Sequence, residues 1–263
     1  MSVCSSRLTS ACRTIAVSFL FATIATSSFA GNCNNLPSHA QLTAALETAV
    51  AANTGGFGLD MWGTIVNREG EVCVLARSGE NPGDQWPGSR VISAQKANTA
   101  NSFSLPGLAL STANLFEAVQ PGGSLFGLQF SNPVNTEVAY RGKFRKYGTA
   151  NDPLVGKRIG GVNVFGGGLA LYSGATLVGA LGVSGDSSCA DHNIAWLVRE
   201  QLGLDSVPAG VGPGGTDGIN YGISGKGFGH PVCGPASAGL GGSPGQEDEI
   251  ADAIGAGGPP DGN

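Results

Sequence analysis

The stretch that decides the fold covers residues 179 to 192 and reads Gly179-Ala180-Leu181-Gly182-Val183-Ser184-Gly185-Asp186-Ser187-Ser188-Cys189-Ala190-Asp191-His192. The apolar run from Leu177 to Val183 has the length of a buried strand, and Gly185 permits a tight turn after it. Ser188 followed by Asp191 has the spacing of a capping box, which predicts a helix from there to about Leu202. We therefore expect a strand, a turn and a helix in direct succession.

The start of this expected helix is a candidate ligand site. Unpaired backbone N–H groups and the positive end of the helix dipole favour a carboxylate or a phosphate at such a position. The simpler alternative is a turn and a helix cap that hold no ligand. The spacing of the residues is compatible with both interpretations.

Together with the glycine-rich run at residues 160–172, this segment resembles the haem-binding GlcG/HbpS family, also described as the haem-degrading or DUF336 domain. The resemblance includes the polar turn Ser173-Gly174, the strand at 178–185, and the helix segment around Lys96, which is similar to a Lys-Ala-x-Thr-Ala motif of that family. It covers residues 42 to 204. The chain departs from the family at Cys189-Ala190-Asp191-His192, where many members carry Glu-Gln-Asp, and it lacks the proline of a Gly-Gly-x-Pro-Leu motif.

The remaining elements predict an α+β fold. An amphipathic pattern predicts a first helix, two β-rich runs predict a hairpin, and two further helical segments follow before the two strands and the last helix. The order of elements favours a mainly antiparallel sheet. The family resemblance implies a profilin-like antiparallel sheet packed against helices. The expected ranges before the last two strands are Leu36–Asn53, Leu59–Asn67, Glu71–Ser78, Arg90–Phe103 and Ser111–Val119.

The first thirty residues have the features of a secretory signal peptide. Arg7 and Arg13 provide a positive start, the apolar stretch 14–26 is too short to span a bilayer, and small residues precede an expected cleavage after Ala30. An uncleaved anchor is the alternative. The signal predicts a periplasmic or secreted protein with no stable membrane anchor.

Two further parts of the chain follow the signal. Residues 31–205 form the expected GlcG/HbpS-like haem-binding domain. Residues 206–263 hold 18 glycines and 7 prolines, a composition that buries little apolar surface, so we expect a tail with local order at best. The tail is expected to be partly held by a disulfide and largely disordered after residue 234.

The charge of the chain argues against nucleic acid as a partner. The full sequence has a formal net charge of −5, and loss of Arg7 and Arg13 with the signal makes it about −7. An acidic chain repels phosphate backbones. The longest basic cluster, at residues 143–146, is expected to be a solvated loop.

Four of the six cysteines follow the expected cleavage site: Cys33, Cys73, Cys189 and Cys233. An even number in an exported chain predicts two disulfides, with three possible connectivities. We favour Cys189 with Cys233 and Cys33 with Cys73, because each pair ties a flexible end to the folded part. A metal site is the rival interpretation, although no two of these cysteines have zinc-ligand spacing.

Candidate ligand residues gather around the last helix. His192 is a candidate axial ligand for haem iron, with Asp191 beside it, although a surface imidazole is the simpler alternative. A Cys189–Cys233 disulfide would bring His230 towards His192. Ser184 lies in the turn as a further ligand candidate, but no order of His and acid residues around it makes a catalytic triad.

Residues earlier in the chain are candidates for the acidic and apolar parts of the ligand. Arg90 and Lys96 are suited to bind carboxylates such as propionates, or alternatively point to water. The alanines of the same helix permit close packing on a sheet or on another subunit. Candidate apolar walls, which are alternatively ordinary core residues, are Met61, Trp62, Trp86, Phe126 and Phe165.

The resemblance implies an exported haem-binding protein that forms homo-oligomers, with haem as cofactor. A second hypothesis is an enzyme that degrades haem or carries out redox chemistry at bound iron. A third is an oligomeric accessory protein that binds a small organic acid. Because the chain has no nucleophile elbow and no nucleotide-binding loop, we expect a binding protein rather than an enzyme.

Overall fold

The computed structural model describes residues 32–52, 55–222, 225 and 227–233. The expected signal peptide, its cleavage site after Ala30 and the tail beyond residue 233 lie outside the described residues. Among the described residues, no helix combines the length and the apolar character that crossing a membrane requires.

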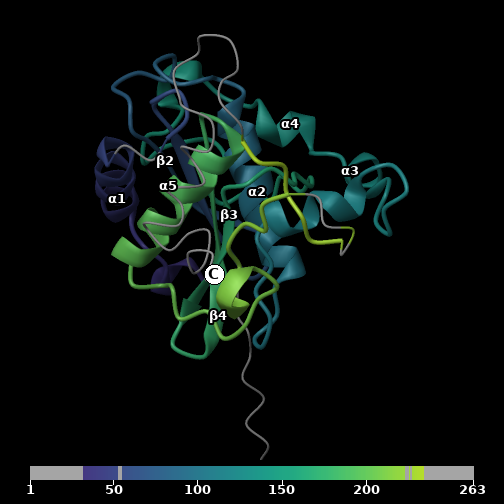
Figure 1. Cartoon of the computed structure of the whole chain (residues 1–263). Coiled ribbons are helices and arrows are strands. Elements are labelled where there is room, and N and C mark those ends of the chain that lie inside the picture. The colour runs from purple at the N-terminus through teal and green to yellow at the C-terminus, as the bar shows by residue number, and fades with distance from the viewer. Residues whose placement is uncertain (1–31, 53–54, 223–224, 226, 234–263) are drawn as a thin grey trace, which may run out of the picture.

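A four-stranded antiparallel sheet forms the centre of the fold (Figure 1). Its strands are β1 (Trp62–Asn67), β2 (Val72–Arg77), β3 (Gly168–Ser173) and β4 (Thr176–Ser184), in the order β2-β1-β4-β3. The two hairpins therefore meet at the centre, where β1 pairs with β4. The predicted α+β class and antiparallel sheet are confirmed.

Helices cover both faces of this sheet. Helices α1 (His39–Ala51) and α5 (Ser188–Gln201) contact each other and pack on one face, whereas α2 (Ser89–Phe103) packs on the other face (Figure 1). Strand alternation explains the arrangement, since Ile65 of β1 faces α1 and α5 while Val66 faces α2. Both faces are buried, so every residue of β1 is buried.

The alanines of α2 lie against the sheet. Ala94, Ala97 and Ala100 are fully buried in the same core cluster as Ala180 of β4. A Cβ added at Gly182 of β4 would stand 1.9 Å from the carbonyl oxygen of Ser93. The small residues therefore serve close helix–sheet packing, and the alternative that they face another subunit is wrong.

The segment between α2 and β3 contains only short helical turns. The expected helix at 111–119 is two 3-10 turns, Ala113–Leu115 and Glu117–Val119, which differs from the single helix that the sequence predicts. Two one-turn helices follow, α3 (Leu128–Ser131) and α4 (Thr136–Ala139). The remaining 3-10 turns are Cys33–Asn35, Phe144–Lys146 and Pro213–Gly215.

The described part of the Gly/Pro-rich segment is docked more closely than its composition predicts. Arg199 of α5 binds Asp217 through two hydrogen bonds of 2.6 and 2.8 Å, and both side chains are buried. The carboxylate of Glu117 accepts hydrogen bonds from the backbone N–H groups of Gly225, Gly227 and Gly229. A buried ion pair and hydrogen bonds to a carboxylate therefore hold this segment, which has few apolar side chains, against the domain.

Two disulfides join the pairs that the sequence favoured. Cys33 is bonded to Cys73, and Cys189 is bonded to Cys233. The first ties the segment before α1 to β2, and the second ties residues 227–233 to the first turn of α5. All four cysteines are therefore in disulfides and are not available as metal ligands in this oxidised form.

Candidate ligand-binding site

The site is built around the turn that joins β4 to α5. Gly185 lies in this turn, and a Cβ added there would stand 2.4 Å from the carbonyl oxygen of Asp60, so only glycine permits this close approach. The carboxylate of Asp186 accepts hydrogen bonds from the backbone N–H groups of Phe57, Leu59 and Ser187. The turn is therefore held in place by the loop that precedes β1.

The helix cap differs by one residue from the predicted capping box. Ser187 is the N-cap, and its hydroxyl accepts a hydrogen bond of 3.2 Å from the N–H of Ala190. The hydroxyl of Ser188 instead contacts Nε2 of His230 at 2.8 Å and accepts a hydrogen bond from the N–H of Gly166 at 2.7 Å. Because Ser187 and Ser188 are adjacent, spacing alone does not tell which of them caps the helix. In the structure the hydroxyl of Ser188 contacts His230, and Ser187 is the cap.

Asp191 forms a buried ion pair with Lys96 rather than a cap. Nζ of Lys96 lies 2.5 Å from Oδ2 of Asp191 and donates to the carbonyl oxygen of Val183 at 3.1 Å. Oδ1 of Asp191 accepts hydrogen bonds from the N–H groups of Gly185 and Asp186. Burial lowers the pKa of Lys96 and raises the pKa of Asp191 to about 6, and the attraction within the pair opposes both shifts.

A pocket of about 320 Å³ lies beside this ion pair. Its walls include two half-exposed aromatic rings, Trp86 and Phe165, which are 52% and 45% exposed. Its polar lining consists of the buried ion pair, Asp186 and three serine hydroxyls. The lining residues are Trp86, Ser89, Ile92, Lys96, Phe165, Ser184, Asp186, Ser188 and Asp191.

The structure thus places three of the six predicted ligand residues at one pocket, namely Lys96, Asp191 and Ser184. Two of the five predicted wall residues, Trp86 and Phe165, are also there. Met61 and Trp62 are fully buried core residues, and Phe126 is exposed and does not line this pocket. Whether these residues bind a ligand stays a prediction.

Arg90 binds a carboxylate of the protein itself. Its Nε donates to Asp152 at 2.9 Å, its Nη1 donates to the carbonyl oxygen of Ala139 at 2.8 Å, and its guanidinium stacks on the ring of Tyr147. The side chain is buried and does not line the pocket. The alternative that Arg90 points to water is wrong, and its guanidinium binds Asp152 of the protein rather than facing this pocket.

His192 is fully buried, so the alternative of a surface imidazole is wrong. Its ring lies 6.2 Å from that of Trp196, and neither ring nitrogen has a hydrogen-bond partner among the described residues. Burial lowers its pKa to about 3 and keeps the ring neutral, while the charges of Asp217 and Arg199 act on it in opposite directions. The residue does not line the pocket.

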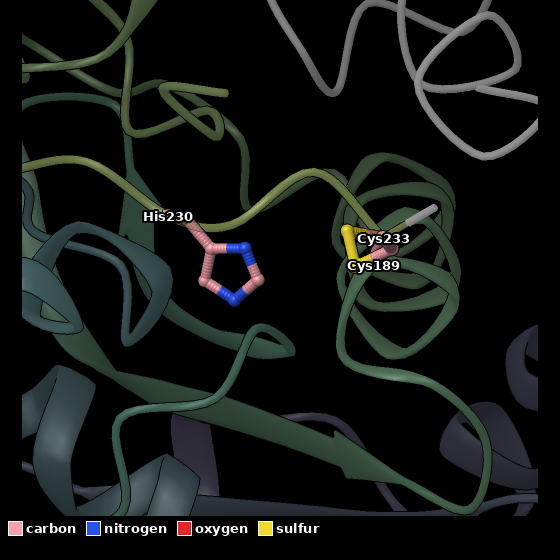
Figure 2. Close-up of side chains that lie close together, drawn as sticks. All are labelled: Cys189, His230 and Cys233. Carbon is pink, nitrogen blue, oxygen red and sulfur yellow. A yellow bond between two sulfur atoms is a disulfide. The ribbon is translucent and has the colours of Figure 1, made fainter. Parts of the chain in front are cut away.

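His230 packs against the first turn of α5, next to the disulfide (Figure 2). Its Nδ1 lies 2.8 Å from the carbonyl oxygen of Pro231, and its ring packs against Phe116. Burial lowers its pKa to about 4. The disulfide holds His230 at the first turn of α5, whereas His192 lies outside the group that His230 forms with the two cysteines.

The sequence-based interpretation missed Ser89, Ile92, Asp186 and Ser188 as lining residues, the last having been predicted only as a helix cap. Ser89, Ile92 and Lys96 recur at intervals of three and four along α2, which places them on one helix face. With Lys96 as a candidate ligand residue, this spacing would have been enough to predict Ser89 and Ile92 as its neighbours at the site. Asp186 had no such signal, because its position depends on the loop before β1.

The model of a protein family described as "Haem degrading protein HbpS-like" matches residues 37–198, which is more than half of the chain. The chain belongs to this HbpS-like family. Lys96, Asp191 and the whole pocket lie within the matched residues of the HbpS-like domain, whereas His230 and Cys233 lie beyond them.

Several solved structures are similar to this chain over about two thirds of its length. A Klebsiella pneumoniae protein described as ORFY of family DUF336 is 25% identical, with a TM-score of 0.43 over 62% of this chain and 86% of that chain. A PduOC:heme complex is also 25% identical, with a TM-score of 0.43 over 62% and 89% of the two chains. HbpS itself is 18% identical, with a TM-score of 0.40 over 64% and 90%. A comparison with curated proteins found no significant match.

The pocket of this HbpS-like domain fits the ring of a haem better than it fits the iron. The half-exposed rings of Trp86 and Phe165 suit a flat apolar ring, and the serine hydroxyls suit its carboxylates. The usual protein ligands of haem iron are His, Cys, Met and Tyr. None of these is among the lining residues that the structure describes.

Proposed function

We propose that this chain is an exported haem-binding protein whose pocket beside the Lys96–Asp191 ion pair receives a flat, acid-bearing ring. The observation that carries the proposal is the pair of half-exposed aromatic residues, Trp86 and Phe165, at the pocket that the buried ion pair lines. Exposed aromatic surface next to convergent polar groups is typical of a ligand site. Membership of the HbpS-like haem-degrading family supports haem as the ligand.

Titration with haemin tests this proposal. The mature oxidised chain is expected to bind about one haemin per chain, with a shifted Soret band and quenched tryptophan fluorescence. Parallel titration with metal-free protoporphyrin IX separates ring binding from iron ligation. Since the lining residues hold no usual iron ligand, we expect the metal-free ring to bind with an affinity within about tenfold of haemin, a difference of about 1.4 kcal/mol.

Substitutions at the pocket locate the ligand. W86A and F165A each remove an aromatic wall and are expected to weaken haemin binding about tenfold, because one aromatic contact contributes about 1–2 kcal/mol. F126A is the matched control, since Phe126 is 58% exposed and does not line this pocket. Equal affinities for all three variants and the unaltered chain would place the ligand elsewhere.

A small organic acid is a second candidate ligand. The volume of about 320 Å³ is at the lower end of the roughly 300–1,000 Å³ that is usual for ligand sites. Displacement of bound protoporphyrin by simple carboxylic acids would favour this candidate. A flat haemin titration combined with calorimetric binding of an organic acid would replace haem as the proposed ligand.

Turnover is tested separately from binding. The family description names haem degradation, so the haemin complex should be incubated with a reductant and an iron chelator. Loss of the Soret band with release of chelated iron indicates an enzyme. A stable spectrum supports the binding protein that we propose.

Export is part of the proposal and is supported by the two disulfides. We expect the mature chain to begin at Gly31, to lie in the periplasm or outside the cell, and to form homo-oligomers. Mass spectrometry of the protein recovered from each cell fraction tests the cleavage. Light scattering measures the oligomeric state, and a monomer would remove that part of the proposal.

A further inference from the structure

Three groups with metal-binding atoms lie together at the first turn of α5. They are Cys189 of α5 and, in the following Gly/Pro-rich segment, Cys233 and His230. Their ligand atoms all lie within 4.8 Å of one another, and Figure 2 shows the imidazole beside the disulfide. Cys189 and His230 are buried and Cys233 is half-buried. The tertiary structure therefore brings the sulfur of Cys189 to a sulfur and an imidazole that lie 41 or more residues further along the sequence.

In the oxidised form the two sulfurs are bonded to each other and do not bind a metal. A dithiol reductant converts the disulfide to two thiols and is itself oxidised to a disulfide. Binding of a divalent cation then releases the two thiol protons and leaves two thiolates on the metal. Two thiolates balance the charge of the cation, so the centre is neutral, as a buried position requires.

The imidazole of His230 is prepared for ligation. One ring nitrogen contacts Ser188 and the other contacts the carbonyl oxygen of Pro231, each at 2.8 Å. Whichever nitrogen binds the metal, the other keeps a partner that orients the ring. Metal-bound histidines in proteins almost always have such a second contact.

His192 supplies an independent observation. It lies three residues after Cys189 on α5, it is fully buried, and both its ring nitrogens lack a hydrogen-bond partner among the described residues. Residues three apart on a helix lie on the same side. His192 is not within the three-residue group, and we assign it to the fourth position because it shares this side of α5 with Cys189. The resulting pattern is Cys189-x-x-His192 with His230-x-x-Cys233.

We propose that reduction of the Cys189–Cys233 disulfide creates a binding site for Zn²⁺ or a similar divalent cation, with Cys189, Cys233 and His230 as ligands and His192 in the fourth position. Two sulfur and two nitrogen ligands form the tetrahedral set that zinc prefers. The disulfide and the metal exclude each other. The same residues thus hold the C-terminal segment to α5 by a covalent bond in one state and by a metal in the other.

The test uses Co²⁺ as a spectroscopic probe for Zn²⁺. The full mature chain carrying C33A and C73A, which removes the other disulfide, is reduced with a phosphine and titrated with Co²⁺. We expect one Co²⁺ per chain, a thiolate-to-cobalt band, the strong visible bands of tetrahedral Co²⁺, and loss of these bands when Zn²⁺ is added. The oxidised chain is expected to give none of them.

Variants assign the ligands. H230A and C233S are each expected to lower the affinity for Co²⁺ by more than tenfold, and H192A is expected to weaken the visible bands of the tetrahedral site. H39A is the matched control, because His39 of α1 contacts Gly148 far from this group, and it is expected to bind like the parent chain. If H230A binds Co²⁺ as tightly as the parent, the proposal is wrong.

A second measurement covers the case in which the reduced chain is less stable. Zn²⁺ that binds the folded site raises the urea midpoint of the reduced parent chain, whereas Zn²⁺ that binds unfolded cysteines does not. The midpoint of the oxidised chain is expected to stay unchanged. A reduced chain that keeps its native circular dichroism but shows neither cobalt bands nor a raised midpoint overturns the proposal. These readouts contain no haem, so they are independent of the proposed function.

Discussion

Lys96 of α2 and Asp191 of α5 form an ion pair of 2.5 Å across the end of the sheet, although 94 residues separate them in the chain. Their side chains are 1% and 3% exposed. The pair connects the two helices that cover opposite faces of the sheet, and it also forms part of the wall of the pocket. Its removal should therefore affect both the stability and the ligand site.

Breaking this pair is expected to destabilise the protein strongly. K96M and D191N each leave an unpaired buried group, which costs about 3–5 kcal/mol of unfolding free energy. The double variant is expected to lose less than the sum of the two. Urea unfolding at neutral pH measures all three values. R158M is the control, because Arg158 forms an exposed pair with Glu69 that contributes about 0–1 kcal/mol.

The buried His192 makes stability depend on pH. Burial lowers its pKa in the folded state to about 3, below its value of about 6.5 in the unfolded chain. The unfolded state therefore binds an extra proton between these two pH values. The contribution of His192 to the unfolding free energy is complete above about pH 6.5 and is lost as the pH falls. H192F is expected to reduce the slope of unfolding free energy against pH by about 1.4 kcal/mol per pH unit in this range.

Unfolding curves at several pH values from about 4 to about 8, which span the histidine transition, measure this difference. H39F is a suitable comparison, because His39 lies in the first turn of α1 and is not enclosed as His192 is. Parallel pH profiles for H192F and the unaltered chain would contradict the assignment of the acid sensitivity to His192.

Close packing of α2 on β4 is expected to tolerate no side chain at Gly182. The Cβ of G182A would lie 1.9 Å from the carbonyl oxygen of Ser93 and 2.5 Å from the backbone nitrogen of Ala97. Backbone atoms must shift to accept it, with a cost of at least about 1–3 kcal/mol. G88A is the control, since nothing lies within 4 Å of a Cβ there and its φ is −64°. Thermal unfolding of the two variants distinguishes them.

Loss of the Cys33–Cys73 disulfide is expected to destabilise the chain by about 3–4 kcal/mol, because the bond closes a loop of about 40 residues. Urea unfolding of C33A/C73A without reductant measures the effect. The pocket lies elsewhere, so ligand affinity in the folded variant should be unchanged. A change in haemin affinity with no change in stability would contradict this separation of roles.

Local patterns in the sequence were sufficient for most of the framework. Strand and helix patterns predicted the first hairpin, β4, α1, α2 and α5 to within a few residues, since each pattern depends on neighbours only a turn or a pleat apart. Strand β3 was expected only from the family resemblance, within the run 160–172, and it covers Gly168–Ser173. The four cysteines that follow the expected signal, and the flexible ends that they tie down, were enough to favour the pairing found in the structure. These features follow from short-range geometry and chain topology.

The partners of the charged and polar side chains were decided by the tertiary structure. Arg90 and Lys96 lie on the same helix and were indistinguishable as anion-binding candidates, yet Arg90 is enclosed by Asp152 and Tyr147 while Lys96 reaches the pocket. Likewise, Ser187 rather than Ser188 caps α5, because His230 occupies the hydroxyl of Ser188. Each outcome depends on which distant segment packs against the helix, and one helix face or one cap motif carries no information about that segment.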